Sequence, residues 1–154
     1  MMIRKVKEED YPRLAEIWES AVTRTHDFLA RKDFLFYKGR LPVYFQYVDL
    51  YGFEREGVLQ GFVGVSEGNI EMLFVHGDCR GACIGKQLIR YAIEELHADR
   101  VDVNEQNAQA VGFYEHEGFA VVGRSALDGD GKAYPLLHMQ LRSGAWDGEC
   151  VRVS

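Results

Sequence analysis

The residues best suited to chemistry lie together between Leu73 and Lys86, in the stretch Leu-Phe-Val-His-Gly-Asp-Cys-Arg-Gly-Ala-Cys-Ile-Gly-Lys. An apolar run leads into a loop of small residues, and a helical pattern follows. Small residues let a ligand approach the backbone, and the first N–H groups of a helix point at it. The arrangement suits phosphate or pyrophosphate, and Arg80 and Lys86 add local positive charge. Alternatively, Gly81 and Gly85 only permit a tight turn and close helix packing.

Two common phosphate-binding motifs do not fit this loop. A P-loop has glycine, four residues, then Gly-Lys and Ser or Thr. Counting back from Gly85-Lys86, Arg80 takes the place of the first glycine, and Gln87 stands where a hydroxyl would hold magnesium. The dinucleotide fingerprint G-x-G-x-x-G is also missing. A nucleoside triphosphatase and a Rossmann-type dehydrogenase are therefore disfavoured.

A metal site is the other chemistry to consider here, because Cys79 and Cys83 lie four residues apart with His76 just upstream. Structural zinc sites usually carry paired Cys-x2-Cys or Cys/His sets, which this spacing does not match. The chain has three cysteines, an odd number that argues against a disulfide framework. We therefore expect no metal. A redox or metal protein is the alternative interpretation, and zinc bound to the purified protein would favour it.

The elements around the loop follow from apolar spacing and turn residues. Helices are expected at about Glu8–Thr25, Cys83–His97 and Ala108–Glu117, the last ended by Gly118. Strands are expected at Ile3–Val6, Val48–Phe53, Val58–Ser66, Ile70–Val75, Arg100–Val103, Phe119–Ala126 and Tyr134–Leu141. Turns are expected at Arg55–Gly57, Glu67–Asn69 and Asp128–Gly131, and the first two make an antiparallel meander. The order β-α-α-β-β-β-α-β-α-β-β predicts an α/β fold with a mixed sheet between helices.

The segment His26–Gln46 is harder to assign, because it is rich in aromatic residues without clean periodicity. A second helix is expected here, with Asp33 as a candidate N-cap, although Gly39 and Pro42 make its course uncertain. Such a helix either covers the sheet or forms a wall of the substrate site.

The composition indicates one globular domain, with 154 residues of which 47% are hydrophobic and 27% charged. We expect the domain to span residues 1–141 and a C-terminal tail to span residues 142–154, where Trp146 could cover a neighbouring subunit of a homodimer. The net charge of -6 argues against nucleic-acid binding. With no apolar signal-peptide stretch and no membrane helix expected, the predicted location is cytoplasmic.

The motifs together resemble the GCN5-related N-acetyltransferase (GNAT) family. Leu73–Val75 running into Arg80–Gly85 matches the family's Arg/Gln-x-x-Gly-x-Gly loop, and a second signature downstream matches Asn-x-x-Ala-x-x-Phe-Tyr and Gly-Phe. That signature consists of Asn107, Ala110, Phe113-Tyr114-Glu115 and Gly118-Phe119. The likeness spans about Ile3–Leu141 and implies a GNAT-like fold, a mixed, mostly antiparallel sheet of about seven strands flanked by about four helices. Small bacterial acetyltransferases of unassigned substrate also share Thr25–Leu29 and Tyr134–Leu137.

The resemblance implies an enzyme that moves an acetyl group from acetyl-CoA directly to a primary amine. It implies that the backbone of Arg80, Gly81, Ala82, Cys83, Ile84, Gly85 and Lys86 holds the pyrophosphate. Leu73, Phe74 and Val75 would lie along the pantetheine arm, on a strand that leaves its neighbour at a bulge, with an N–H near Val75 facing the thioester oxygen. Asn107 either bonds the same arm or only caps its helix. Cys83 replaces the first motif glycine, which is workable at negative φ and strained at positive φ.

Tyr114 is the expected general acid, because a phenol stays protonated at neutral pH and can meet a forming thiolate. The alternative is a half-buried helix aromatic. The base stays open. Many family members carry glutamate where Asn69 stands, and Glu71 would point to the same face and could accept a proton through water. His26, oriented by Asp27, is the second candidate, and a reaction without a dedicated base is the third.

The acceptor channel is implied by the same resemblance. Its expected residues are His26, Asp27, Phe28 and Tyr134, with the segment Phe34–Tyr37 closing the other side. Trp18 lies on the apolar face of its helix and is expected in the core. The acceptor could be a small amine, an antibiotic, an amino acid or a peptide amine. A non-catalytic acyl-CoA-binding module on the same scaffold is the alternative to an enzyme.

Overall fold

The computed structural model describes residues 2–25, 28–77 and 83–142, which form a seven-stranded sheet between helices. The strands are β1 (Met2–Lys5), β2 (Asp49–Arg55), β3 (Val58–Ser66), β4 (Asn69–Val75), β5 (Arg100–Asn104), β6 (Phe119–Ser125) and β7 (Leu136–Leu141). The helices are α1 (Tyr11–Thr25), after the 3-10 turn η1 (Glu8–Asp10), α2 (Arg31–Phe45), α3 (Ile84–Glu94) and α4 (Ala108–His116). The order of elements and the mixed α/β class predicted from the sequence are confirmed.

The strands lie in the order β1-β2-β3-β4-β5-β7-β6, and β4–β5 is the parallel pair of an otherwise antiparallel sheet. A parallel pair needs a crossover, which α3 supplies. The predicted meander β2–β3–β4 is confirmed. Its two hairpins close where Glu56-Gly57 and Glu67-Gly68 take positive φ, as tight hairpin turns require.

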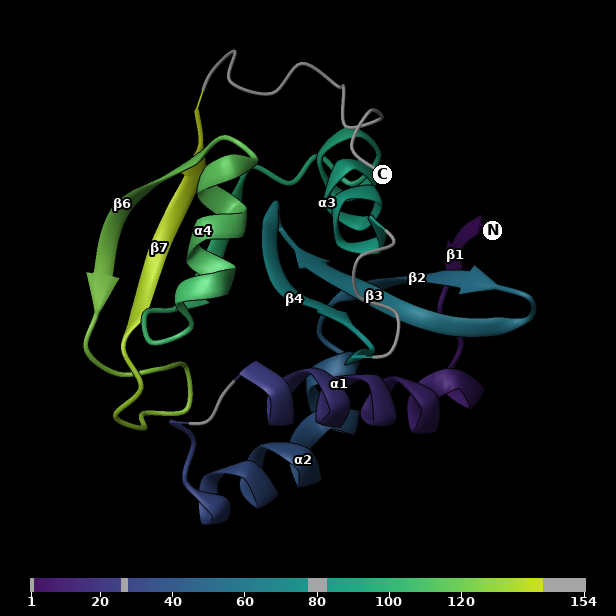
Figure 1. Cartoon of the computed structure of the whole chain (residues 1–154), viewed down its shortest axis with the longest axis horizontal. Helices are drawn as coiled ribbons and strands as arrows, with labels where there is room; N and C mark the ends of the chain where they lie inside the picture. The colour runs from purple at the N-terminus through teal and green to yellow at the C-terminus, as the bar shows by residue number, and fades with distance from the viewer. Residues whose placement is uncertain (1, 26–27, 78–82, 143–154) are drawn as a thin grey trace.

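Two apolar clusters fill the two sides of the sheet, and Figure 1 shows α1 and α2 together on one side. The α1/α2 cluster contains Leu14, Ile17, Trp18, Val22, Phe34, Leu41 and Phe45, packed on Leu50, Leu59 and Phe62 of the sheet. The second cluster contains Ile84, Leu88, Ile89, Ala92 and Tyr114 of α3 and α4, packed on strand residues that include Phe53, Val63 and Met139. The predicted core position of Trp18 is confirmed.

Helix α2 covers the sheet, but its start differs from the prediction. Ala30 is the N-cap residue, and Asp33 lies inside the first turn. The carboxylate of Asp33 accepts a hydrogen bond from the Tyr134 hydroxyl at 2.5 Å and pairs with Lys132 Nζ at 3.1 Å. The predicted N-cap is therefore wrong, because this side chain is bound across the molecule to the β6–β7 loop. The helix continues through Gly39 and Pro42.

Smaller differences concern the ends of elements. Helix α3 spans Ile84–Glu94 and is shorter than the predicted Cys83–His97. Cys83 and His97 both take positive φ, so neither can be part of a right-handed helix. Strand β7 begins at Leu136, so Tyr134 belongs to the preceding loop. Gly118 ends α4 with a φ of 101°, as predicted. Of the predicted tail 142–154, residues 143–154, which include Trp146, lie outside the described residues. Within the described ranges, no helix is long and apolar enough to cross a membrane.

Two glycines are expected to respond oppositely to alanine. Gly39 lies in the interior of α2, and an added Cβ would have open space around it. Gly39→Ala should raise the free energy of unfolding by about 1 kcal/mol through helix propensity. At Gly61, a Cβ would lie 3.0 Å from the Phe74 carbonyl and 3.1 Å from side-chain atoms of Ile84 and Leu88. Gly61→Ala should lower it by about 1–3 kcal/mol. Urea unfolding measures both, and equal effects would contradict the packing around Gly61.

Candidate active site

Strand β4 separates from β5 after a short contact. The two strands pair only at Asn69–Arg100 and Ile70–Val101 along their described lengths. Further along, His76 N donates to the Gln60 carbonyl of β3 at 2.9 Å. Because successive residues of a strand direct their N–H groups to opposite edges, the Val75 N–H points to the edge that β5 has left. The predicted separation of this strand is confirmed, and it exposes backbone groups inside the sheet.

A β-bulge accompanies the separation. Met72 pairs with Gly64 and Ile70 with Val65, so Glu71 is the extra residue on β4. Asn69 Nδ2 donates to Glu71 Oε2 at 2.6 Å, which confirms that these two side chains share a face. Past the bulge, Met72 packs with the α1/α2 cluster. The bulge therefore turns both Glu71 and Met72 toward the side of α1 and α2.

A cleft of about 220 Å³ lies where β4 leaves β5. Its lining consists of Leu73, Phe74 and Val75 of β4, Gly85 of α3, Asn107, Gln109, Ala110, Phe113 and Tyr114 around α4, and Ala21, Arg24 and Thr25 of α1. Asn107 also caps α4, since its Oδ1 accepts the Ala110 N–H at 3.2 Å. The capping interpretation of Asn107 is confirmed, and its contact with a cofactor stays a prediction.

Tyr114 forms the inner wall of this cleft and is only 6% exposed. Its ring packs edge-on against Phe113 and Phe119. Burial raises the pKa of the Tyr114 hydroxyl, so the phenol keeps its proton at neutral pH. A neutral phenol is the protonation state that the predicted general acid would need.

The end of the predicted phosphate-binding loop lies beside the cleft, which Gly85 of α3 lines. Cys83 takes φ 60° and ψ 20°, the strained condition for this residue, and immediately precedes α3. The first N–H groups of α3 belong to Ile84, Gly85 and Lys86 and have no partner within the helix. The Lys86 ammonium pairs with the buried Glu117 at 2.7 Å, so its charge is largely compensated, contrary to the prediction. Arg80, Gly81 and Ala82 lie outside the described residues.

Arg24 is a cation that the sequence analysis missed. Its side chain lines the cleft and lies directly over Gly77, where a Cβ would collide with the guanidinium. The Gly77 N–H donates to Ser20 Oγ at 2.9 Å, which joins the end of β4 to α1. More than 50 residues separate Arg24 from Gly77, so no local pattern could have predicted this contact.

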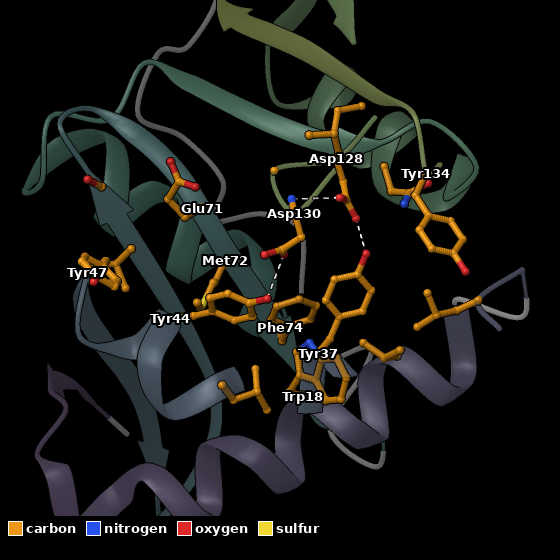
Figure 2. A pocket seen from close by; sticks show the side chains of 18 residues that line it. Trp18, Tyr37, Tyr44, Tyr47, Glu71, Met72, Phe74, Asp128, Asp130 and Tyr134 are labelled. Atoms are coloured by element: carbon orange, nitrogen blue, oxygen red, sulfur yellow. Dashed lines mark hydrogen bonds between the residues drawn. The ribbon is translucent and has the colours of Figure 1, made fainter. Parts of the chain in front are cut away.

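A second cavity, of about 580 Å³, lies on the α1/α2 side of β4. Figure 2 shows aromatic side chains and carboxylates around it. Its aromatic lining residues are Trp18, Tyr37, Tyr44, Tyr47, Phe74 and Tyr134, and its acidic ones are Glu71, Asp128 and Asp130. Phe74 lines this cavity and the cleft, so the two spaces meet at β4. An apolar, acidic cavity suits an amine with a hydrocarbon stem.

Tyrosines join α2 to the β6–β7 loop over this cavity. The Tyr37 hydroxyl donates to Asp128, and the Tyr44 hydroxyl donates to Asp130 Oδ2 at 2.8 Å. Burial and the bond to Asp130 raise the pKa of Tyr44 to about 12. Tyr134 crosses in the opposite direction to α2, accepting the Ala30 N–H at 3.1 Å. The loop is therefore held over the cavity from both sides.

The predicted acceptor residues are only partly described. Tyr134 lines the cavity, and the centroid of the Phe28 ring lies 6.1 Å from the centroid of the Tyr134 ring. Of the segment Phe34–Tyr37, Tyr37 reaches the cavity, whereas Phe34 is buried in the core. His26 and Asp27 lie outside the described residues. No group of three or more potential metal-binding side chains occurs among the residues that the structure describes.

Comparison with known proteins decides the family. The sequence model of the acetyltransferase (GNAT) domain matches residues 39–142. This chain belongs to the GNAT family. The GNAT chain is 37% identical, over 147 residues, to the peptidyl-lysine N-acetyltransferase YjaB of Salmonella typhimurium, covering 89% of this chain and 95% of the relative. It is therefore an N-acetyltransferase.

Solved structures agree with this GNAT fold. The solution structure of apo YjaB from Escherichia coli has a TM-score of 0.82 and 34% identity, covering 90% of this chain and 95% of the other. The PaiA N-acetyltransferase of Thermoplasma acidophilum, in complex with coenzyme A, has a TM-score of 0.70 at 19% identity, covering 92% and 98%. The latter likeness concerns the fold alone. Acetyl-CoA is the acyl donor of the family.

The site of this acetyltransferase fits that donor. The cleft is open along β4, the first N–H groups of α3 lie at one end, and Tyr114 lines its interior.

Asp128 and Asp130 line the larger cavity, although the sequence predicts only a turn at these residues. Their Asp-Gly-Asp-Gly pattern predicts a turn well, and Asp128 Oδ1 does accept the Asp130 N–H at 2.9 Å. Nothing local indicates that their other oxygens reach α2.

The strain at Cys83 can be measured. Cys83→Gly should raise the free energy of unfolding by about 1 kcal/mol, because glycine adopts this left-handed conformation without a Cβ penalty. Cys83→Ala is the matched control, since it removes the thiol and keeps the strain. Urea unfolding distinguishes the two, and equal stability of the glycine and alanine variants would contradict the strain.

Proposed function

We propose that this GNAT enzyme transfers the acetyl group of acetyl-CoA to the ε-amino group of lysine side chains in peptides or proteins. The observation that carries the proposal is the meeting at β4 of an apolar cleft containing Tyr114 and an aromatic cavity containing three carboxylates. A lysine side chain has an apolar stem and a cationic end, which match that cavity. The peptidyl-lysine activity in the names of the YjaB relatives supports the same acceptor.

Binding of the donor would use both ends of the cleft. The N–H groups of Ile84, Gly85 and Lys86 face an anion at the start of α3, and Arg24 adds positive charge near the end of β4. The exposed edge of β4 offers backbone groups of Leu73 and Val75 to an extended amide-containing arm. Acetyl-CoA, when bound, supplies an activated thioester.

The residues then divide the chemistry among them. Glu71 would accept the proton of the lysine ammonium, directly or through water, and the freed amine forms the new C–N bond. The Val75 N–H would donate to the carbonyl oxygen as negative charge develops there. The Tyr114 hydroxyl would give its proton to sulfur as the C–S bond breaks, and the second proton of the attacking nitrogen, lost as the amide forms, would restore that hydroxyl. The apolar cleft raises the pKa of Tyr114 and also disfavours a thiolate. The proton affinities of the phenolate and of the leaving sulfur therefore rise together, and the proton can still pass to sulfur.

The acceptor is tested with a peptide that has a blocked N-terminus and a single lysine. Incubated with acetyl-CoA and enzyme, it should gain one acetyl group by mass spectrometry, while the same peptide with arginine gains none. Calorimetric titration of acetyl-CoA should show saturable one-to-one binding. Binding of acetyl-CoA with acetylation of small amines, but not of the lysine peptide, would refute the proposed acceptor.

Replacement of Tyr114 by phenylalanine tests the acid. Tyr114→Phe should lower kcat roughly a hundredfold, because sulfur then leaves without a proton donor. The Kd for acetyl-CoA should stay the same, since the ring and its packing remain. Tyr91→Phe, on α3 beside Tyr51, is the matched control and should keep wild-type turnover. Unchanged turnover in Tyr114→Phe would exclude the acid role.

The negative charge of Asp130 should strengthen binding of the lysine peptide. Asp130→Asn should raise KM for the lysine peptide about fivefold and leave kcat unchanged, because one carboxylate near the ammonium is worth about 1 kcal/mol at a solvated site. The effect should shrink at high salt. Glu94→Gln removes an equal charge from the exposed side of α3 and should leave KM unchanged. A salt-independent rise in KM would indicate a structural effect instead.

A further inference from the structure

A row of hydrogen-bonded side chains crosses four strands beside the cavity of about 580 Å³ that is proposed to take the lysine, called the acceptor cavity below. Ser125 Oγ of β6 lies 2.6 Å from His138 Nε2 of β7, and His138 Nδ1 lies 2.6 Å from Asp102 Oδ1 of β5. On β4, Asn69 Nδ2 lies 3.4 Å from the other Asp102 oxygen and donates to Glu71 at 2.6 Å. The row therefore begins at a Ser-His-Asp arrangement and ends at the proposed base.

A polar cavity of about 400 Å³ follows the same row. Glu71 and Ser66 line both this cavity and the acceptor cavity, so the Glu71 carboxylate stands where the two meet. His138 and Asp102 line the polar cavity, with side chains 36% and 35% exposed. A polar space of this size has room for water, which can carry protons between groups that do not touch.

The partners of His138 suit it to accepting a proton. With Nδ1–H donating to Asp102, the lone pair of Nε2 accepts the Ser125 hydroxyl proton in the neutral ring. When Nε2 gains a proton, the Ser125 hydroxyl rotates and its oxygen accepts the new N–H, while Asp102 stabilises the imidazolium. Gly123 of β6 lies opposite His138, and an added Cβ would be 3.5 Å from the ring. The ring thus lies across β6 toward Ser125.

We propose that His138 is the final proton acceptor of the acetyl transfer and receives, through water in the polar cavity, the proton that Glu71 takes from the lysine ammonium. The inference rests on the proposed function. The protons balance. The ammonium proton passes to the Glu71 carboxylate, Glu71 gives a proton to water, and water gives one to His138 Nε2 as the Ser125 hydroxyl turns its proton away from that nitrogen. The second proton, which the nitrogen loses as the amide forms, restores the Tyr114 hydroxyl that has protonated the sulfur. The imidazolium later loses its proton to solvent. Histidine exchanges protons nearer neutral pH than a carboxylate, so it is the better-matched terminal base.

Charged groups surround His138 on several elements. They are Asp102 and Arg100 of β5, Glu71 of β4 and Glu67 of the β3–β4 turn. The one cation among them, Arg100, pairs with Asp99 at 3.1 Å. The other charged groups along the polar cavity are carboxylates, and Asp102 is the one that contacts the His138 ring.

The kinetic test uses acetyl-CoA and the blocked single-lysine peptide. His138→Ala should lower kcat roughly a hundredfold with little change in KM. Imidazole added to the buffer should restore about a tenth of the wild-type rate or more, with the rescued rate rising with the neutral fraction of imidazole. Gln140→Ala, in the same cavity but outside the row, should keep the wild-type rate. A wild-type rate in His138→Ala, or a loss that imidazole does not restore, would overturn the proposal.

A second measurement needs no acceptor. NMR titration of the His138 ring in the full chain should give a lower midpoint in Glu71→Gln than in the wild type, because a negative charge near the imidazolium is lost. An unchanged midpoint would overturn the coupling of Glu71 to His138. If the wild-type enzyme fails to acetylate the peptide, the proposed acceptor is wrong, and this titration still decides whether the two groups communicate.

Discussion

Two pairs of residues hold β4 to β5, and the separation beyond them is the constraint on which the site depends. Inside a sheet, backbone N–H and C=O groups are normally paired with a neighbouring strand. Here the edge of β4 near Val75 lies open in the middle of the sheet, and α4 brings Tyr114 to it. The bulge at Glu71 begins the change in direction. A fully paired β4–β5 would close the cleft between β4 and α4.

The two faces of β4 differ in the charged groups that line them. Arg24 and the N-terminus of α3 lie by the cleft, whereas Glu71, Asp128 and Asp130 line the cavity on the other side. Under the proposed function, an anionic donor and a cationic acceptor would approach one carbonyl carbon from opposite sides of this strand.

The carboxylates of Asp128 and Asp130 accept hydrogen bonds from neutral tyrosines, so these bonds do not cancel their negative charge. Tyr44 donates a hydrogen bond to Asp130 as a neutral group, and its pKa, raised to about 12, keeps it neutral under ordinary conditions. By contrast, Lys86 and Glu117 compensate each other as an ion pair. Helix α2 both enters the core and lines the cavity. Phe34 stacks on Trp18 of α1 and Phe45 contacts Phe62 of the sheet. Tyr37 and Tyr44 line the cavity instead. This double use explains its unclear periodicity.

The sequence by itself determined the order of elements, the buried faces of α1 and α3 and the two tight hairpins. These features depend on residues close in the chain, whose spacing reports directly on a helix, a strand or a turn. Tyr114 could be named because its motif is local, and Glu71 because it lies two residues from Asn69 on one strand face. Their catalytic roles stay predictions. The N-cap assigned to Asp33 failed because its true partners, Tyr134 and Lys132, lie about 100 residues away.

Only the tertiary structure decided which distant side chains meet. Strand β7 lies between β5 and β6, so His138 contacts Asp102 and Ser125 although they are 36 and 13 residues away in the chain. The same holds for Arg24 over Gly77 and for the tyrosines that bind the β6–β7 loop. The order of strands in a sheet is a global choice that no local spacing encodes, and the polar networks of this enzyme exist only once that choice is made.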